Sequence, residues 1–494
     1  MDCLANDTTK CMAKMYLLNR GGNVNYDMPV MLLYMVWSSR FGVAGVTMVS
    51  ILSSYTVIPS EATPNCSLLL SESEQINAPT HSLTIYVYKP NHLNKIIPNM
   101  NMVDTMRDSL AKILVHYYPL AGRLRMIQGR RWEVECNAKG VILLEAESTR
   151  ALNDYAIFEP NDTIKELIPK VDYTEPIENS PLFLVQLTRF SNGGFCVGIA
   201  ISNIITDGIS GTHFINLWAT LARGDTLEEH DMPLLNKVVL QSSDKKPCFD
   251  HKEFKPLPLV LGHADTTEES KKETTVAMLK LSREMVEKLK KKANEGNQGR
   301  AYSRYESISA HIWRCVVKAR DGYHNQPTVV HIIAGARNRL NPPLPLNYFG
   351  NATYPTVTPT CLSGDIVSKP LSYVAHKIRE AIEVLTDEYL RSGFGFIRSQ
   401  SDVGWLREKN DNEGKVESLF LGNPNLNIWS WMRNMPMYGP NFGWGRPVYM
   451  GPGVVKGDGR AFIMPGQEDG SVLVAIRLQS AHVEAFKEVF HKDM

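Results

Sequence analysis

Residues 201–224 read ISNIITDGISGTHFINLWATLARG, and this stretch decides how the rest of the chain is arranged. An apolar run ends in a polar turn over 203–208, and a helix follows whose apolar face carries Phe214, Leu217, Trp218 and Leu221. Such a strand-to-helix corner leaves the core while both of its flanks stay anchored there, so it can expose a reacting side chain. Asn203 and Asp207, which lie in the turn, are therefore the first candidates for function.

The segments before this turn have the patterns of paired strands. Residues 183–190 and 195–202, joined through Asn192-Gly193-Gly194, predict a β-hairpin whose second arm leads into the turn. Residues 132–136 and 140–145 predict a second pair of strands. Strand and helix patterns alternate in both halves of the chain, which predicts two α/β domains with a cleft between them.

Composition describes an ordinary globular protein. The chain has 494 residues, 43% hydrophobic and 21% charged, with a formal net charge of +1. This balance gives no reason to expect a nucleic acid or an anionic membrane as a partner. The eight cysteines are scattered, without a Cys-x-x-Cys pair or a neighbouring histidine cluster. We therefore expect no metal site, no disulfide framework and a cytoplasmic location.

The expected domain boundaries follow a change in composition. Residues 224–275 hold four prolines, several charges and little periodicity, which predicts a crossover linker. It would join an N-terminal domain at 48–223 to a C-terminal domain at 276–494. We expect these domains to be of similar size, each a mixed sheet with helices.

Residues 1–47 are predicted to be an N-terminal extension that is not native, with Met48 as the true start. Residues 28–52 are mostly apolar, but Ser38, Ser39 and Arg40 interrupt them midway. A charge at the centre of a spanning helix costs about 2.5–3.5 kcal/mol on insertion scales, so a membrane anchor, the alternative, is poor. The stretch also lacks the short apolar core and small-residue cleavage site of a signal peptide.

Six ordered motifs together resemble one family. The motifs lie at 54–64, 118–124 (YPLAGRL), 310–315 (AHIWRC), 337–345 (RNRLNPPLP), 348–352 (YFGNA) and 441–447 (NFGWGRP). With these motifs, the chain from about Met48 to the C-terminus resembles the plant BAHD acyltransferases, which move an acyl group from coenzyme A to an alcohol or amine. The subgroup that the chain resembles most is the spermidine hydroxycinnamoyl transferases, on the opening SYTVIP and on NQPTVV at 325–330.

The resemblance implies two chloramphenicol-acetyltransferase-like domains with a channel that admits coenzyme A from one face and the acceptor from the other. The family signature His-x-x-x-Asp-Gly supplies a histidine that takes the acceptor's proton, and an aspartate that pairs with an arginine to hold the turn. A second signature, Asp-Phe-Gly-Trp-Gly, is mainly structural. We expect a monomer without a bound cofactor, whose partners are an acyl-CoA donor and an amine or alcohol acceptor.

At the first signature this chain has Asn203 in the histidine position, while Asp207 and Gly208 are kept. An asparagine amide cannot take a full proton near neutral pH, and loss of a positioned general base typically costs about 10²–10⁴ in rate. Asp207 keeps its structural role, with Arg337 or Arg339 as the expected partner.

At the second signature Asn441 replaces the aspartate, before the motif residues Gly443, Trp444 and Gly445. This change removes a charge and an expected ion pair, whose loss could cost several kcal/mol unless amide hydrogen bonds replace it. Many family members also have an acidic residue two positions before the first arginine of Arg-x-Arg, and this position is Gly335 here.

Other residues complete the expected site. Trp429 and Ser430 lie on the strand that lines the family's channel and are predicted to bind substrate, while Trp431 is predicted to be core. His213, His311 and His331 could in principle replace the missing base, although packing or surface roles are favoured.

Three functions follow for testing. The first is an acyltransferase with weak or substrate-assisted activity, transferring a hydroxycinnamoyl group to spermidine, another amine or an alcohol. An amine acceptor helps because a neutral amine attacks a thioester unaided, although an alkyl ammonium is only about one part in a thousand neutral at pH 7. The second is a catalytically inactive binding protein, and the third is an elimination or cyclisation in the same cavity.

Overall fold

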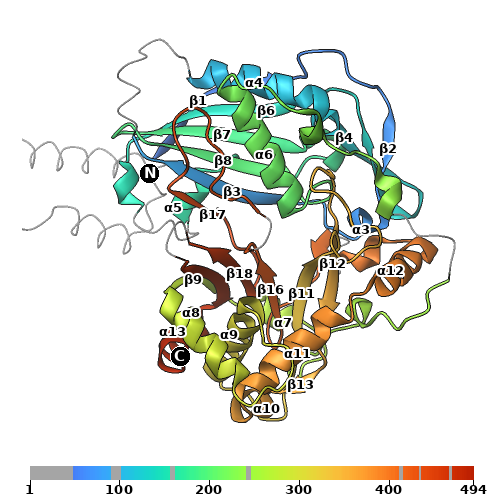
Figure 1. The fold of residues 1–494 in the computed structure, drawn as a ribbon, viewed down its shortest axis with the longest axis vertical. Helices are drawn as coiled ribbons and strands as arrows, with labels where there is room; N and C mark the ends of the chain where they lie inside the picture. Colours follow the sequence, from blue (N-terminus) through green and yellow to red (C-terminus); the bar gives the residue numbers. More distant parts are fainter. Residues whose placement is uncertain are drawn as a thin grey trace, which may run out of the picture. The chain divides into compact units, whose positions relative to one another are not determined.

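The computed structural model describes residues 48–90, 102–155, 162–240, 246–410, 416–432, 435–466 and 470–494. The predicted extension at 1–47 lies outside the described residues. Residues Met48–Met494 form one unit, in which two six-stranded sheets each carry helices (Figure 1). We call the part around the first sheet the first lobe and the part around the second sheet the second lobe. The α/β class with two mixed sheets is confirmed.

The first sheet has the strand order β1-β6-β7-β8-β3-β17. Its strands β6 and β7 are parallel and the others antiparallel. The predicted hairpin is confirmed as β7 and β8, and all eight residues of β8 are buried, because this strand lies inside a sheet covered on both faces. The bounds are β1 (Val49–Val57), β6 (Val141–Ser148), β7 (Phe183–Phe190), β8 (Phe195–Ser202), β3 (His81–Tyr88) and β17 (Tyr449–Pro452).

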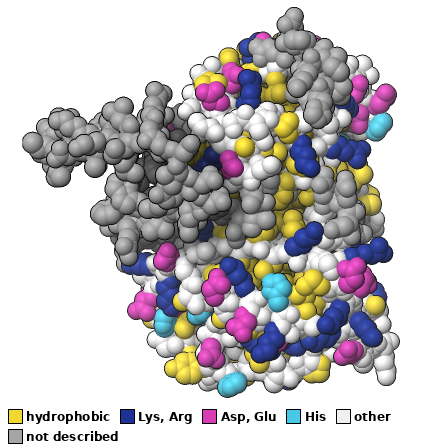
Figure 2. Space-filling view, turned by 90° about the vertical axis from the view of Figure 1, so that its left-hand side faces the viewer, with side chains coloured by type: hydrophobic (Ala, Val, Ile, Leu, Met, Phe, Trp, Pro, Cys, Tyr) yellow, Lys and Arg dark blue, Asp and Glu magenta, His cyan; other side chains and the backbone are white. Residues whose placement is uncertain are grey.

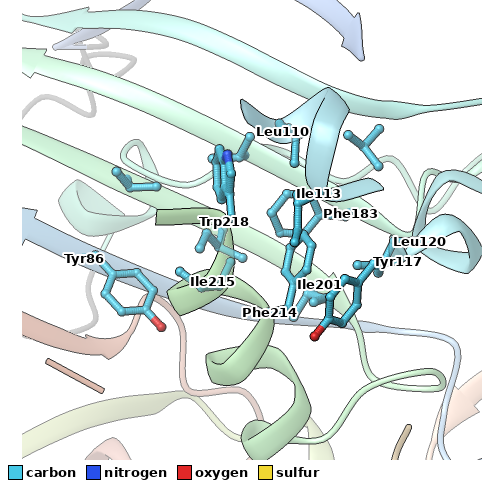
Figure 3. Packing of buried hydrophobic residues seen from close by; sticks show 14 of the residues in the cluster. Tyr86, Leu110, Ile113, Tyr117, Leu120, Phe183, Ile201, Phe214, Ile215 and Trp218 are labelled. Atoms are coloured by element: carbon cyan, nitrogen blue, oxygen red, sulfur yellow. The ribbon is translucent and has the colours of Figure 1, made fainter. Parts of the chain in front are cut away.

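Helices α4 (Met102–His116) and α6 (Gly208–Ala222) cover one face of this sheet (Figure 1). The ring of Phe214 meets those of Tyr117 and Phe183 edge to face, with centroids 5.1 and 5.3 Å away (Figure 3). The indole N–H of Trp218 donates to the hydroxyl of Ser109 on α4 at 3.0 Å. These contacts fix α6, and therefore the turn that precedes it.

The second sheet has the order β12-β11-β16-β18-β19-β9. Four helices bury one of its faces, while Phe462 and Met464 on the other face belong to the same apolar cluster as α6. The two lobes are therefore joined by apolar packing. The strands are β12 (Thr353–Val357), β11 (Val330–Gly335), β16 (Leu426–Ser430), β18 (Arg460–Pro465), β19 (Val472–Gln479) and β9 (Thr274–Leu281), and the helices are α8 (Arg283–Asn294), α9 (Arg304–Arg320), α11 (Leu371–Glu383) and α13 (Ser480–Lys492).

Shorter elements complete the described chain. The small sheets are β2 (Ser67–Leu69) with β5 (Arg131–Glu135) and β4 (Arg123–Ile127), β10 (Pro327–Thr328) with β13 (Cys361–Leu362), and β14 (Glu408–Asn410) with β15 (Val416–Ser418). The remaining α-helices are α3 (Glu72–Gln75), α5 (Asp162–Lys165), α7 (Thr267–Lys271), α10 (Ser363–Ser368) and α12 (Asp387–Ser399). Single 3₁₀ turns lie at Tyr118–Ala121, Gln128–Arg130, Leu152–Asp154, Ile177–Asn179, Glu229–Asp231, Lys237–Leu240, Lys252–Phe254 and Gly404–Leu406.

One predicted strand pairing is wrong. The strands expected at 132–136 and 140–145 exist as β5 and β6, but β5 pairs with β2 and β4 whereas β6 pairs with β1 and β7. Ala138 and Gly140 both have positive φ and turn the chain between the strands. The N–H of Gly140 then donates to the carbonyl of Ala121 at 2.9 Å, so β6 leaves for the other sheet.

The predicted domain boundaries stay a prediction, but one strand of the predicted C-terminal domain, β17, lies in the sheet of the predicted N-terminal domain. This strand lies within the predicted C-terminal domain, yet it pairs with β3 of the first sheet, Tyr449 opposite Val87 (Figure 1). The predicted crossover is anchored at Lys237, whose buried ammonium group donates to Glu74 Oε1 at 2.6 Å and to the Phe349 carbonyl at 2.8 Å. The first sheet is therefore completed by a strand from the later half of the chain.

The surface carries both signs of charge. On the face shown in Figure 2, Lys and Arg side chains are interspersed with Asp and Glu, as the net charge of +1 leads one to expect. No helix in the described ranges is long and apolar enough to cross a membrane. Within the same ranges, no three His, Cys, Asp or Glu side chains are grouped to hold a metal ion. A site for a charged ligand must come from a local grouping.

We predict that Phe214→Ala destabilises the protein by about 3–5 kcal/mol, because it removes a fully buried ring and leaves a cavity under α6. Urea unfolding followed by tryptophan fluorescence measures this loss. Leu52→Ala is the control, since Leu52 is 50% exposed and its truncation should change stability by less than about 0.5 kcal/mol. Equal effects of the two substitutions would contradict the packing described for α6.

Candidate active site

Asn203 follows β8 directly, and its side chain is held at both ends. The hydroxyl of Ser82 donates to Oδ1, and Nδ2 donates to the Thr80 hydroxyl at 3.0 Å. The Asn203 backbone N–H donates to the Thr80 carbonyl at 2.9 Å, and its carbonyl accepts from the Asn351 amide at 2.7 Å. The half-buried amide is therefore positioned by both lobes.

The chemistry of this amide is limited to hydrogen bonding. A carboxamide has two N–H donors and one acceptor oxygen, and it does not take a full proton near neutral pH. Nδ2 carries a second N–H that no described residue accepts. Asn203 can therefore donate to a ligand oxygen, but it cannot remove the proton of an attacking hydroxyl.

Asp207 caps the helix that follows the turn. Its Oδ1 accepts from the Ser210 N–H at 2.8 Å, which satisfies one of the free donors at the start of α6. Its Oδ2 pairs with the Arg337 guanidinium and accepts from the Ala352 N–H at 3.0 Å. Both charged side chains are buried. Of the two arginines expected as partners, Arg337 makes the ion pair.

Arg337 extends the pair into a network with the loop 348–352. Its Nη2 donates to the Ser210 hydroxyl at 2.7 Å and to the Tyr348 carbonyl at 3.2 Å, and the Ser210 hydroxyl donates to the Gly350 carbonyl at 2.8 Å. A buried ion pair must recover a large desolvation penalty, and such added hydrogen bonds help to offset it. The start of α6 is thereby fastened to the second lobe.

Arg339 serves a different element. Its Nη1 donates to the carbonyls of Ile382 and Leu385, at 3.0 and 3.1 Å, near the C-terminal end of α11. Carbonyls at a helix C-terminus have free acceptor capacity, and a cation there also favours the helix dipole. Arg339 therefore holds α11, away from the Asp207 carboxylate.

The second signature forms a closed loop around Asn441. Its Oδ1 accepts from the N–H groups of Gly443 and Gly445, both at 3.0 Å. Both glycines have positive φ, which a side chain would strain. The Trp444 ring meets Phe195 edge to face at 4.6 Å, inside the first lobe. Because only an acceptor oxygen is used, asparagine replaces aspartate here without breaking the loop.

Trp429 and Ser430 lie on opposite faces of β16. The Trp429 ring packs towards the first lobe, and its N–H donates to the side chain of Asn427. Ser430 is exposed on the other face, where its hydroxyl accepts from the Met432 N–H at 3.3 Å. The structure therefore brings Trp429, but not Ser430, to the face between the lobes. Trp431 packs on Phe462 at 5.0 Å, as the core role predicts.

The three candidate histidines have no described hydrogen bond to Asn203. His311 lies between α9 and α13 with a ring nitrogen 2.9 Å from the Phe490 carbonyl, and burial lowers its pKa to about 4. Burial also lowers the pKa of His213, which lies on α6 near Asp231. His331 is buried on β11 and its Nδ1 has no partner among the described residues. Packing explains His311, while His331 has unused hydrogen-bonding capacity.

Sequence reasoning missed the residues that hold Asn203. Thr80 and Ser82 meet it because β3 pairs with β8 in a register that sets His81 opposite Ser202. Only knowledge of that pairing could have signalled them, since 121 residues separate Ser82 from Asn203. Asn351 belongs to the motif at 348–352, but its hydrogen bond to the turn depends on contact between the lobes.

We predict that Asp207→Asn lowers the free energy of unfolding by about 3–5 kcal/mol, because it leaves the Arg337 charge buried without a partner. Urea unfolding of the variant checks this. Asn441→Asp is the matched control: it makes the opposite change of charge at a position where Oδ1 keeps both hydrogen bonds, so we expect a change below about 1 kcal/mol. A small effect at Asp207 would contradict a structural role for the ion pair.

Comparisons with known proteins agree with this architecture. Residues 47–493 match the model of the Transferase family. The chain is 44% identical over 457 residues to hydroxycinnamoyl-CoA:piscidic acid hydroxycinnamoyltransferase of Actaea racemosa, covering 90% of this chain and 100% of that protein. It is 36% identical over 447 residues to shikimate O-hydroxycinnamoyltransferase of Nicotiana tabacum, covering 90% and 99%.

Solved structures share the fold. Vinorine synthase superposes with a TM-score of 0.65 at 21% identity, covering 88% of this chain and 96% of that one. TRI101 of F. graminearum, solved with coenzyme A and T-2 mycotoxin, gives a TM-score of 0.71 at 15% identity, covering 86% and 97%. Because the family model and the relatives cover almost all of the described chain, this protein belongs to the transferase family of acyl-CoA-dependent BAHD acyltransferases.

Proposed function

We propose that this protein transfers a hydroxycinnamoyl group from its coenzyme A thioester to a hydroxyl or amine of a small acceptor. The observation that carries the proposal is the turn 203–208, where the Asp207–Arg337 pair and the bonds of Asn203 hold the residues of the family's catalytic signature in a defined geometry. Two relatives act on piscidic acid and shikimate with hydroxycinnamoyl donors, which supports the acyl group. We further propose that it works as a cytoplasmic monomer without a cofactor.

By the resemblance, Asn203 stands where the family has its general base. Its second Nδ2 donor can stabilise the thioester carbonyl oxygen as negative charge develops there, and one such donor is worth about 10²–10³ in rate. The missing base costs about 10²–10⁴. We therefore expect slow transfer to hydroxyls and less hindered transfer to amines, of which spermidine remains the acceptor predicted from sequence.

A basic pocket supports the binding of an acyl-CoA. Its volume is about 270 Å³, and Arg283, Lys290 and Arg304 line it together with Glu287, Val286 and Gly470. Arg283 and Arg304 are the first residues of α8 and α9. Neither arginine forms an ion pair with a described residue, whereas Lys290 pairs with Glu287 at 3.2 Å. The pocket therefore suits the phosphates of coenzyme A.

A second candidate function is the binding of acyl-CoA without turnover. The observation that favours it is that Thr80 and Ser82 bond to both ends of the Asn203 amide, and no described titrating side chain bonds to it. The scaffold would then keep its donor site while lacking the proton acceptor. Thermal stabilisation by p-coumaroyl-CoA without coenzyme A release would support this function.

We predict that Asn203→His raises kcat/KM about 10²- to 10⁴-fold for a hydroxyl acceptor and less for an amine, because imidazole can take the proton that the amide cannot. Coenzyme A release from p-coumaroyl-CoA, measured with a thiol reagent and a panel of alcohols and polyamines, gives both rates. Asn192→His, in the exposed β7–β8 turn, is the control and should change nothing. If neither the natural protein nor Asn203→His releases coenzyme A with any pair of donor and acceptor, the acyltransferase proposal is wrong.

We also predict that Arg283→Met combined with Arg304→Met weakens acyl-CoA binding about tenfold or more and leaves kcat unchanged, because the two arginines touch only the donor's phosphates. Calorimetric titration with coenzyme A and the KM for p-coumaroyl-CoA measure the effect. Lys288→Met on α8 is the control, since Lys288 does not line the pocket. If the double variant binds coenzyme A with unchanged affinity, this pocket does not bind the donor's phosphates.

A further inference from the structure

Three polar side chains lie in a row across neighbouring strands of the second sheet. On β11, β16 and β18 the register sets His331 opposite Asn427, and Asn427 opposite Arg460. Their chain neighbours Ile332, Ile428 and Ala461 belong to the core under the helices, so the row lies on the face turned towards the first lobe. The row therefore has an imidazole at one end and a guanidinium at the other.

Arg460 has no acidic partner among the described residues. Its guanidinium lies 5.5 Å from the centre of the Trp429 ring, and it forms no ion pair or hydrogen bond with a described side chain. Burial lowers the pKa of Arg460. The neighbouring charge is also basic: loss of water lowers the pKa of Lys456, and the positive charge of Arg460 lowers it further. A partly desolvated cation without a counter-charge costs free energy that an anionic ligand recovers.

His331 adds an unused polar atom beside Arg460. The residue is 8% exposed, and its buried Nδ1 finds no partner in the described chain. Burial lowers the pKa of His331 to about 4, and the charge of Arg460 contributes, so the ring is neutral at physiological pH. A neutral imidazole nitrogen can hydrogen-bond to a hydroxyl or carboxyl group. A ligand that satisfies both His331 and Arg460 therefore combines polar oxygens with a negative charge.

Contacts connect this row to the turn. Lys456 lies 5.4 Å from the centre of the Tyr173 ring, whose hydroxyl is 3.0 Å from Nδ1 of His81. His81 precedes Ser82, which holds Asn203. The basic side chains of the second lobe thus adjoin the strand that positions the catalytic turn of the first.

The row and the basic donor pocket stand at opposite ends of one strand. Arg460 begins β18, whereas Gly470, which lines the donor pocket, lies five residues beyond its end at Pro465. Six strand residues span roughly 20 Å, so one small anionic group cannot reach both regions. If both regions bind anions, they bind different groups.

We propose that Arg460, with His331 and Asn427 beside it, binds a carboxylate of the acyl acceptor, so that the acceptor is a hydroxy acid or an amino acid. A guanidinium can bind a carboxylate through two parallel hydrogen bonds, which fixes both position and orientation. A polyamine such as spermidine would instead bring ammonium groups beside Arg460 and Lys456, where like charges repel. The proposal rests on the proposed acyl transfer and narrows its acceptor from any alcohol or amine to an acid.

Binding measurements test the site without requiring turnover. The full chain is titrated by calorimetry with shikimate, piscidic acid and 5-hydroxyanthranilate, with the methyl ester of each acid, and with spermidine. We expect at least one acid to bind more tightly than its ester and than spermidine. Arg460→Met should weaken that acid about 10- to 100-fold, because a charge-assisted pair is lost, and should leave the ester unchanged.

Two variants control for folding and for general charge. Arg460→Lys keeps a cation over the Trp429 ring and should retain part of the affinity, since it loses only the two-pronged geometry. Arg189→Met removes an arginine that is 60% exposed on the first lobe and should change no affinity. Near-ultraviolet circular dichroism and the thermal midpoint show whether each variant is folded.

Several outcomes would overturn the acid site. They are equal weakening of acid and ester, tighter binding of spermidine than of every acid, no binding of any acid, or a loss of p-coumaroyl-CoA affinity in place of acid affinity. In the last case Arg460 binds a phosphate of the donor. If an acid binds in a manner that depends on Arg460 but no acyl group is transferred to it, the proposed acyl transfer is contradicted and the acid site stands. If an acyl group is transferred to a neutral acceptor at a rate that Arg460→Met leaves unchanged, the acid site is contradicted and the proposed acyl transfer stands.

Discussion

The buried ion pair between Asp207 and Arg337 is the interaction on which the site depends. It joins Asp207, the residue that caps α6 in one lobe, to Arg337 of the other lobe, and the same carboxylate accepts from the Ala352 N–H. Ser210 and the loop 348–352 supply the hydrogen bonds that make such a desolvated pair tolerable. Asn351 in the same loop then reaches the carbonyl of Asn203. The position of the reacting turn is therefore a property of the contact between the lobes and not of either lobe alone.

This arrangement separates two requirements that one signature combines. The structural requirement is met, because the carboxylate caps α6 and holds its arginine. The chemical requirement concerns the residue after β8, which presents an amide whose oxygen already accepts from Ser82. Under the proposed function the family scaffold stays intact while the proton transfer differs, since Asn203 and the capping Asp207 are separate groups four residues apart.

The sequence pattern predicted those elements whose form depends on residues close together in the chain. The β7–β8 hairpin and the helix after Asp207 follow from turn residues, alternation and capping over short distances. The pairing of β5 with β6 was wrong, and Ser430 proved to lie on the face of β16 opposite Trp429. The row His331–Asn427–Arg460 and the hydroxyls around Asn203 were beyond reach, because each depends on the register between strands far apart in the sequence. No short window of sequence contains that information.

Strand β17 carries a consequence for how such a protein can change. Because this strand of the later half completes the sheet of the earlier half, neither half is a self-sufficient module. Separation of the two halves would leave the first sheet with an uncovered edge and the later half with an unpaired segment, and a chimera of halves from two relatives would have to fit β17 of one against β3 of the other. New specificity in such a scaffold is therefore expected to arise by substitution within a fixed pair of lobes, and the two substrate-facing surfaces must evolve together in one gene.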